Sequence, residues 1–361
     1  MKKLYRINQD NIFSQLQCFF DKARSGILVP VILPEKLDSL DLNQIEVPQN
    51  ADFAVATSGT TGKPKLYFRT LKSWTDFYPE LNKTFKISKD SRIFINGSLA
   101  FTGNLNIGLD AVCNDIFLYC SSSMKAAVWA EEILANNCDV VYMIPDKLFH
   151  LCCSGIKFKE VKTVLCGSQK VSEKLFDMLK NTFPSAKFYS YYGTSEVSYV
   201  CYKEMSSENC ESSMMGSFFK GVSVQITEDN HIIVFSPYCI IPKESFDTGD
   251  IGYIKNKQLY LTGRSDDILN VGGEKINKSV LIERIQKCPG VKECDITLFD
   301  TGVKTRIMAH ISGKKEDISL HMIDFSGIPQ VFVPAHYIFY DELPRNESGK
   351  ILITTQLSKN G

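Results

Sequence analysis

The 361-residue chain has no surplus of charge of either sign, because 41 lysines and arginines balance 41 aspartates and glutamates. This balance gives no electrostatic reason to expect nucleic acid or an anionic membrane as a partner. No window of the sequence approaches the apolar length that is needed to cross a bilayer. Polar residues follow the start Met1-Lys2-Lys3, where a secretory signal peptide would have an apolar stretch. These absences predict a soluble, cytoplasmic protein without a membrane span.

Cysteine is not scarce, with 12 residues, but the sequence contains no Cys-x-x-Cys pair. The five histidines are scattered, so the spacing of a metal site is absent as well. Most of the cysteines lie in apolar stretches, as Cys113, Cys120, Cys166 and Cys239 do. We therefore expect buried, reduced thiols in a reducing compartment.

The sequence does contain enough apolar residues for a packed core, with 44% hydrophobic and 23% charged residues. Its length suffices for two domains. Over about the first 200 residues, short apolar runs alternate with helical patterns, which predicts an α/β layered domain. Strands are expected at 53–57, 93–96, 116–120, 140–144, 161–165 and 187–191, and helices at 124–135 and 172–182.

Beyond about residue 205 the pattern changes to short strands separated by turns, which predicts a β-rich subdomain in the form of a small barrel or a distorted sheet. The expected strands are 222–226, 232–235, 252–254 and 258–261. A mixed part follows, with a helix near 280–287 and strands near 295–299, 305–311 and 337–340. The polar, turn-prone segment 262–267 is the best candidate for a boundary. We expect an N-terminal domain over 1–265 and a small, mobile α+β C-terminal domain over 266–361.

The strongest local signal is a loop rich in glycine and hydroxyl groups that follows a predicted strand. Glycines give its backbone conformations that other residues avoid and expose the N–H groups. Hydroxyls add hydrogen-bond donors and lysines add positive charge, so such a loop can wrap a polyphosphate. Its glycines are too close together for the P-loop of the NTPases. The residues expected to bind phosphate are Thr57, Ser58, Gly59, Thr60, Thr61, Gly62, Lys63 and Lys65.

This loop resembles the phosphate loop of the adenylate-forming superfamily, which includes acyl-CoA synthetases, peptide-synthetase adenylation domains and firefly luciferase. Further motifs of the superfamily follow in the same order. The run Tyr-Tyr-Gly-Thr-Ser-Glu at 191–196 resembles the family's Tyr-Gly-x-Thr-Glu and follows a predicted strand, where α/β folds place ligands. The resemblance implies that Tyr192 stacks on adenine, that Ser195 contacts the α-phosphate and that Glu196 binds Mg²⁺. Gly193 and Thr194 belong to the same ATP-binding motif.

Two later motifs complete the nucleotide site by resemblance. The run Asp-Thr-Gly-Asp at 247–250 resembles the family's Thr-Gly-Asp, which implies that Asp250 binds the ribose hydroxyls, a task suited to a carboxylate. The run Gly-Arg-Ser-Asp-Asp at 263–267 resembles the family's hinge motif. It implies that Arg264 holds ribose or phosphate and that Asp266 is the hinge about which the C-terminal domain turns. A weaker match, Cys-Gly-Ser-Gln, falls where the family lines the adenine and adds Gly167, Ser168 and Gln169.

The segment 343–351, Leu-Pro-Arg-Asn-Glu-Ser-Gly-Lys-Ile, resembles the C-terminal motif that contains the family's adenylation lysine. Lys350 is a compact cation on a long stem. The resemblance implies that it bridges the carboxylate and the α-phosphate as charge builds up in the transition state.

The sequence also departs from the family. Only 56 residues precede the phosphate loop, so the first subdomain is shortened, and exposed apolar surface would then favour a homodimer. The family's glycine after the loop is Leu66, and Phe101 takes the place where many acyl-CoA synthetases have histidine, so we assign Phe101 to the acyl pocket. Near Phe101 the chain lacks the aspartate by which peptide-synthetase domains bind an α-ammonium group, which disfavours α-amino acids as substrates.

The resemblance implies an α/β enzyme with a large N-terminal domain and a mobile C-terminal domain. It would use ATP and Mg²⁺ to adenylate a small-molecule carboxylic acid and then pass the acyl group to a pantetheine thiol, with Lys350, Glu196 and Ser195 as catalytic residues. Coenzyme A and the phosphopantetheine of an acyl carrier protein remain open as acceptors. A non-catalytic nucleotide-binding remnant is the alternative from another class of protein.

Overall fold

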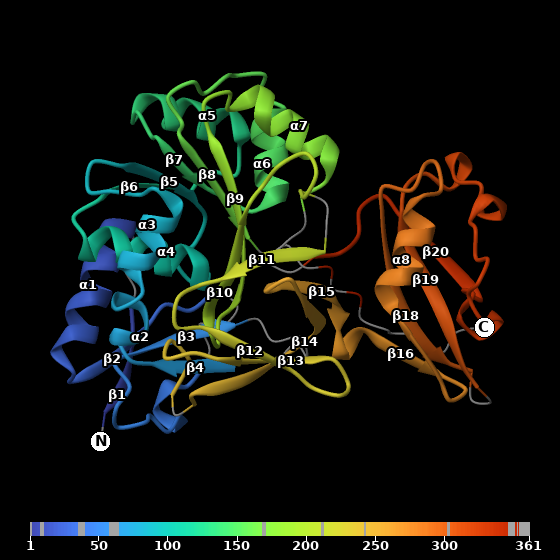
Figure 1. Cartoon of the computed structure of the whole chain (residues 1–361), viewed down its shortest axis with the longest axis horizontal. Coiled ribbons are helices and arrows are strands. Elements are labelled where there is room, and N and C mark those ends of the chain that lie inside the picture. Colours follow the sequence, from blue (N-terminus) through green and yellow to red (C-terminus); the bar gives the residue numbers. More distant parts are fainter. Residues whose placement is uncertain are drawn as a thin grey trace. The chain divides into compact units, whose positions relative to one another are not determined.

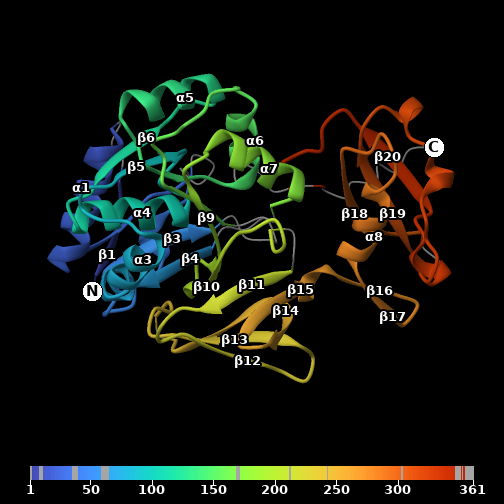
Figure 2. The same ribbon diagram turned by 45° about the horizontal axis from the view of Figure 1, so that its top comes forward.

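The computed structural model describes residues 2–7, 11–34, 40–57, 65–167, 171–210, 213–241, 243–301, 304–345, 351 and 353, without the side chain of Asp266. The chain divides into two compact units. The first comprises Met1–Thr248 and Gly252–Thr262, and the second comprises Gly249–Ile251 and Gly263–Gly361. Figures 1 and 2 show the elements of each unit from two directions.

The first unit is built on one 11-stranded sheet with the order β12-β13-β14-β15-β11-β10-β9-β8-β7-β5-β6. Strands β5 to β9 run parallel to one another, and β10 is antiparallel to β9. The parallel strands are β5 (Arg92–Asn96), β6 (Phe117–Ser121), β7 (Val140–Tyr142), β8 (Thr163–Gly167) and β9 (Lys187–Thr194). The remaining strands are β10 (Ser198–Glu204), β11 (Met214–Phe218), β12 (Ser223–Ile226), β13 (His231–Phe235), β14 (Ser245–Lys255) and β15 (Gln258–Arg264).

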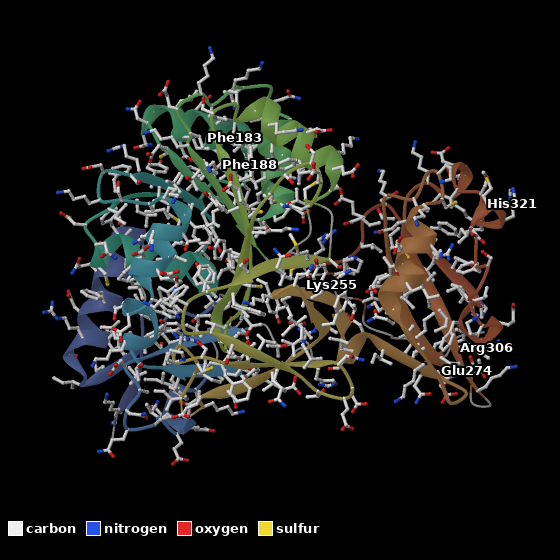
Figure 3. The ribbon with its side chains drawn as sticks, viewed as in Figure 1. Phe183, Phe188, Lys255, Glu274, Arg306 and His321 are labelled. Carbon is white, nitrogen blue, oxygen red and sulfur yellow. The ribbon has the colours of Figure 1, made fainter. Side chains whose placement is uncertain are left out.

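Helices cover both faces of the parallel strands, because side chains alternate between the two faces along each strand. In β5, Ile93 and Ile95 belong to a core shared with α1 (Ile12–Ser25), α3 (Tyr78–Phe85) and α4 (Thr102–Cys113), whereas Phe94 belongs to a core shared with α5 (Ala126–Ala135), α6 (Pro145–Cys152) and α7 (Glu173–Thr182). Figure 1 shows the two groups of helices on opposite faces, and Figure 3 labels Phe183 and Phe188 of the second core. Strands buried on both faces are typical of a layered α/β fold.

Two small sheets stand apart from the large one. Strands β1 (Lys3–Arg6) and β2 (Leu28–Val31) pair in parallel, and β3 (Phe53–Thr57) and β4 (Lys65–Arg69) form an antiparallel hairpin. Helix α1 connects β1 to β2. Asn11 caps its N-terminus by accepting hydrogen bonds from two backbone N–H groups, and Gly26 ends it in a left-handed conformation at φ 66°. The short α2 (Lys72–Thr75) follows β4.

The second unit has its own core around α8 (Lys278–Gln286). This helix packs against the sheet β18-β19-β20, made of Glu293–Asp300, Thr305–Ser312 and His336–Tyr340. Strands β16 (Ile268–Val271) and β17 (Glu274–Asn277) form a hairpin joined by Gly272 and Gly273 at φ 65° and 87°. Positive φ at both turn residues is the geometry that hairpins favour and that glycine supplies without strain. Figure 3 labels Glu274 at this hairpin.

The predicted fold class is confirmed, with differences in detail. The β-rich segment forms no separate barrel, because its strands continue the large sheet through β11 and β10. Strand β8 lies two residues later than expected, and β9 extends to Thr194. The sequence patterns predicted neither α1 nor α4, and they missed β4.

All 12 cysteines are free thiols, and eight of them are buried. Of the four named from their apolar stretches, Cys166 and Cys239 are buried as expected, whereas Cys113 and Cys120 are only half-buried. Burial raises the pKa of the Cys166 thiol to about 12, which keeps it protonated and unreactive. No helix among the described residues is both long enough and apolar enough to cross a membrane.

Candidate active site

The phosphate-loop motif closes the β3–β4 hairpin. Thr57 ends β3 and lies opposite Lys65, the first residue of β4. Of the predicted phosphate-binding residues, Ser58, Gly59, Thr60, Thr61, Gly62 and Lys63 lie outside the described residues. Leu66 stands where the family usually has glycine. Its side chain packs against a small core that includes Val29, Val31 and Ala54.

The second motif lies partly within a strand and partly in the turn after it. Tyr192, Gly193 and Thr194 belong to β9, so the expectation that the motif follows the strand holds only from Ser195 onward. A Cβ on Gly193 would lie 2.2 Å from the carbonyl oxygen of Ser198, so only glycine fits where β9 and β10 meet. The Tyr192 side chain is buried, with 8% of the residue exposed.

Ser195 and Glu196 present their side chains from the turn between β9 and β10. The Ser195 hydroxyl lies 2.8 Å from the Thr102 hydroxyl, at the first residue of α4. The Tyr67 hydroxyl hydrogen-bonds to the Glu196 carboxylate. Burial raises the pKa of Tyr67 most, and this hydrogen bond raises it further. The turn thus offers a hydroxyl pair and a carboxylate at the carboxyl end of the parallel strands, where open α/β sheets bind ligands.

A buried arginine holds this turn in place. Arg69, at the end of β4, is 0% exposed, and its guanidinium donates to the carbonyl oxygens of Ser195 at 2.6 Å and Glu196 at 3.4 Å. It also donates to the Ser198 hydroxyl at 2.6 Å and to the Tyr238 carbonyl oxygen. Burial lowers the pKa of Arg69 to about 10, so it remains a cation at neutral pH. One side chain therefore ties the hairpin of the phosphate loop to the Ser195–Glu196 turn.

Sequence patterns did not predict Arg69, Tyr67 or Thr102 as site residues. An arginine at the end of a strand gives no sign that it is buried. One partner, Ser73, is only four positions away, but the partners in and beside the turn follow Arg69 by 126 to 169 positions, and Thr102 lies 93 positions before Ser195. The spacing of residues within one motif cannot predict contacts between residues so far apart in the chain.

The predicted ribose-binding residues form an ion pair in the second unit. Arg264 Nη1 lies 2.7 Å from Asp250 Oδ1, and the Asp250 side chain is only 10% exposed. The Ser265 hydroxyl donates to the carbonyl oxygen of Gly249 at 3.0 Å, which fixes the start of the hinge motif beside the Asp250 segment. Asp266 lies in the short 3₁₀ turn Ser265–Asp267.

The other predicted residues are distributed as follows. Phe101 is the N-cap residue of α4 and directly precedes Thr102. Gly167 ends β8, where a Cβ would lie 2.6 Å from the Tyr191 ring, while Ser168 and Gln169 lie outside the described residues. Lys350 also lies outside them; Arg345 and Ile351 on either side of its segment form an antiparallel bridge.

The described residues contain no group of three or more His, Cys, Asp or Glu side chains that could hold a metal ion. Mg²⁺ does not need one, because it usually keeps several waters and binds through one or two carboxylates together with substrate phosphates. Glu196, with one carboxylate in a polar turn, fits such a site.

Residues 11–234 match the family model of the AMP-binding enzymes. The VraA protein of Staphylococcus haemolyticus (strain JCSC1435), named provisionally as a long chain fatty acid-CoA ligase, is 25% identical over 83% of this chain and 68% of its own length. A 3,4-dihydroxybenzoate–[aryl-carrier protein] ligase of Bacillus anthracis is 23% identical over 92% of this chain and 80% of its own length. The chain spans only 57% of the VraA protein of Staphylococcus aureus (strain COL), at 27% identity.

The fold is that of solved adenylate-forming enzymes. O-succinylbenzoate coenzyme A synthetase (MenE) from Bacillus subtilis, in complex with AMP, superposes with a TM-score of 0.77 over 99% of this chain and 88% of that chain, at 17% identity. The same enzyme has been solved in complex with ATP and a magnesium ion. The match of the family model over more than half of the chain confirms the resemblance drawn from the motifs. The chain belongs to the family of AMP-binding enzymes and is an AMP-forming ligase.

Proposed function

We propose that this chain activates a carboxylic acid with ATP as an acyl-adenylate and then transfers the acyl group to the pantetheine thiol of coenzyme A. The main support is the turn that places the Ser195 hydroxyl 2.8 Å from Thr102 and is held by Arg69. Coenzyme A ligases among the sequence relatives support the choice of acceptor.

In the first half-reaction the carboxylate attacks the α-phosphate and pyrophosphate leaves. The chain's part is positioning and charge neutralisation. The loop between Thr57 and Lys65 would hold the outer phosphates, Tyr192 the adenine, and Asp250 with Arg264 the ribose. Ser195 would donate to the α-phosphate, and Lys350 would neutralise the charge shared by carboxylate and phosphate.

Glu196 would hold the Mg²⁺ that accompanies the nucleotide. The ion supplies charge neutralisation at the phosphate oxygens. The Tyr67 hydroxyl, which hydrogen-bonds to Glu196, would orient the carboxylate for this contact.

In the second half-reaction the thiol attacks the acyl-adenylate and AMP leaves. We propose that the C-terminal domain first turns about Asp266, which removes Lys350 and admits the thiol. A domain rotation of this kind can itself limit turnover.

A carrier-protein thiol is the second candidate for the acceptor. The observation in its favour is the aryl-carrier protein ligase of Bacillus anthracis, which matches 92% of this chain. Coenzyme A and a carrier present the same pantetheine thiol, so the first half-reaction is common to both. A nucleotide-binding remnant remains the alternative outside enzymes, although such a remnant would have no need to keep Glu196, Asp250, Arg264 and Lys350.

Pyrophosphate exchange over a panel of short, aryl, amino and long-chain acids tests the first half-reaction. Mass analysis with coenzyme A or candidate carriers then identifies the acceptor. We expect ATP-dependent exchange with at least one acid and a thioester product. A folded protein that binds ATP but exchanges pyrophosphate with no acid would support the remnant and contradict the proposal.

A further inference from the structure

Three tyrosines gather on the α4 side of the sheet, close to the Ser195–Thr102 hydroxyl pair. Tyr142 ends β7, Tyr191 lies in β9 and Tyr199 lies in β10. The hydroxyls of Tyr142 and Tyr191 are 2.7 Å apart. The rings of Tyr191 and Tyr199 are in contact, with centroids 4.6 Å apart. We call Tyr142, Tyr191 and Tyr199 the tyrosine cluster.

Two glycines make room for this cluster. A Cβ on Gly103, in the first turn of α4, would lie 2.1 Å from the Tyr142 hydroxyl, and a Cβ on Gly167 would lie 2.6 Å from the Tyr191 ring. Ring atoms therefore fill the space between the first turn of α4 and the ends of β7 and β8. Gly103 directly follows Thr102, so the rings lie close to the Ser195–Thr102 pair. If the carboxylate of the acid lies at Ser195, only a short acid fits before it contacts the rings.

The same region contains buried polar atoms without a hydrogen-bond partner among the described residues. They are the hydroxyl of Tyr199 and Oδ1 of Asn106. Tyr199 as a residue is 4% exposed and Asn106 is 3% exposed. Asn106 lies three positions after Gly103 and so on the same face of α4, as does Asp110, whose Oδ2 also has no such partner. Leaving buried polar atoms unpaired is unfavourable, and native proteins do so rarely. These atoms are suited to pair with a group that a bound molecule brings.

We infer that the substrate is a compact acid with a hydrogen-bond donor at the end away from its carboxylate. Tyr142 and Tyr191 limit its length, and Tyr199 and Asn106 bind the donor. The inference rests on the proposed function, because it takes Ser195 as the place where the carboxylate reacts. A long alkyl chain would have to displace the tyrosine cluster and would leave the buried polar atoms unpaired. The expected substrate thus differs from the long-chain fatty acid in the name of VraA.

Matched pairs of acids test the inference by pyrophosphate exchange with the full chain. The pairs are 4-hydroxybenzoate with benzoate and 6-hydroxyhexanoate with hexanoate, and decanoate is the long acid. In at least one pair we expect the hydroxylated acid to have a kcat/KM about tenfold or more above that of its partner. The acid without the hydroxyl would leave the polar groups of the site unpaired. Decanoate should react least.

The outcomes separate the inference from the proposed function. A preference for decanoate, or equal rates within both pairs, would overturn the inference while the adenylating activity stands. Exchange with none of these acids, nor with any member of the wider panel, would contradict the proposed function, and the inference would fall with it.

Two variants assign the effect to the named residues. Tyr199→Phe removes only the hydroxyl and should bring the ratio within the preferred pair toward one. Tyr142→Ala opens space and should raise the rate with decanoate relative to the short acids. Tyr119→Phe is the matched control, since it removes a hydroxyl that is bonded to Glu132 on the far side of the sheet; it should keep the wild-type ratio. A folded Tyr199→Phe protein with the wild-type ratio would overturn the assignment, even if Tyr142→Ala fails to fold.

Discussion

At the residue scale, Arg69 shows how a side chain outside every motif can position those within them. Its planar guanidinium reaches two carbonyl oxygens of the Ser195–Glu196 turn and, on the other side, Ser198 and Tyr238. A lysine has one ammonium group and cannot reproduce this fork. The turn would then keep its carbonyl oxygens but lose most of their donors, at a position where the arginine side chain is fully buried.

We therefore expect Arg69→Lys to lower the free energy of unfolding by about 3 kcal/mol. The exchange rate should fall about 100-fold, because small displacements of reacting groups are costly. The Mg²⁺ concentration for half-maximal exchange should rise as Glu196 shifts, which a purely structural loss would not cause. Urea melts and Mg²⁺ titrations measure these effects, with Arg306→Lys in the second unit as control. A folded variant with the wild-type rate and Mg²⁺ dependence would contradict the assignment.

Ser195 gives a second test at this scale. Ser195→Ala removes the hydroxyl beside Thr102, and we expect pyrophosphate exchange to fall about 100-fold, the usual effect of losing one donor to a charged transition state. Ser195→Thr keeps the hydroxyl, and threonine is the residue that the family usually has here, so most of the rate should remain. Equal rates for the alanine variant and the wild type would mean that Ser195 only shapes the turn.

At the scale of the element, α4 provides Thr102 and the residues behind it, yet no sequence pattern revealed it. A helix is recognised by an apolar stripe beside a polar one, but all residues from Asn104 to Ala111 are buried. It also contains Gly103 and Gly108, which weaken helices; a Cβ on Gly108 would lie 2.7 Å from Leu16. Helix α7 was predictable because it has a buried stripe and is capped by Ser172.

Asp110, in α4, is expected to make the free energy of unfolding depend on pH. Burial raises the pKa of this carboxyl from 3.8 to about 6, although the side chains of Asn82 and Asn114 donate to it. The folded protein thus binds the proton more tightly than the unfolded chain, so stability falls as the pH rises from 3.8 through 6. Asp110→Asn should raise the free energy of unfolding at pH 8 by about 3 kcal/mol, since one pKa unit corresponds to about 1.4 kcal/mol, and change it little near pH 4.

Urea melts at the two pH values measure this difference. Asp90→Asn, at an exposed position, is the matched control and should behave as the wild type at both. A destabilised Asp110→Asn protein at pH 8 would show that the charged carboxylate is needed in the fold.

At the scale of the whole molecule, the sequence predicted what is local and missed what is long-range. Apolar runs bounded by turn residues located β3, β5 and β7, and the change of pattern near residue 205 marked the β-rich part. Motifs suggested Ser195, Glu196 and Asp250 as candidate site residues because the residues of each motif are neighbours in the chain. The contacts of Arg69 with Ser195 and of Tyr142 with Tyr191 join separate elements, and only the packing of the sheet brings such residues together.

The division of labour between the two half-reactions is a property of the whole chain, and Lys350 tests it. Lys350→Ala should lower the rate of adenylation roughly 10²- to 10³-fold, while thioester formation from a pre-made acyl-adenylate is spared. The cation is needed only while charge moves between the carboxylate and the α-phosphate, and nothing in the attack of the thiol requires it. If Lys350 were an ordinary surface residue, both steps would proceed at the wild-type rate. Equal collapse of both steps would point to unfolding of the C-terminal domain, which a melting curve detects. Wild-type pyrophosphate exchange by the purified, folded variant would refute the proposed part of Lys350 in adenylation.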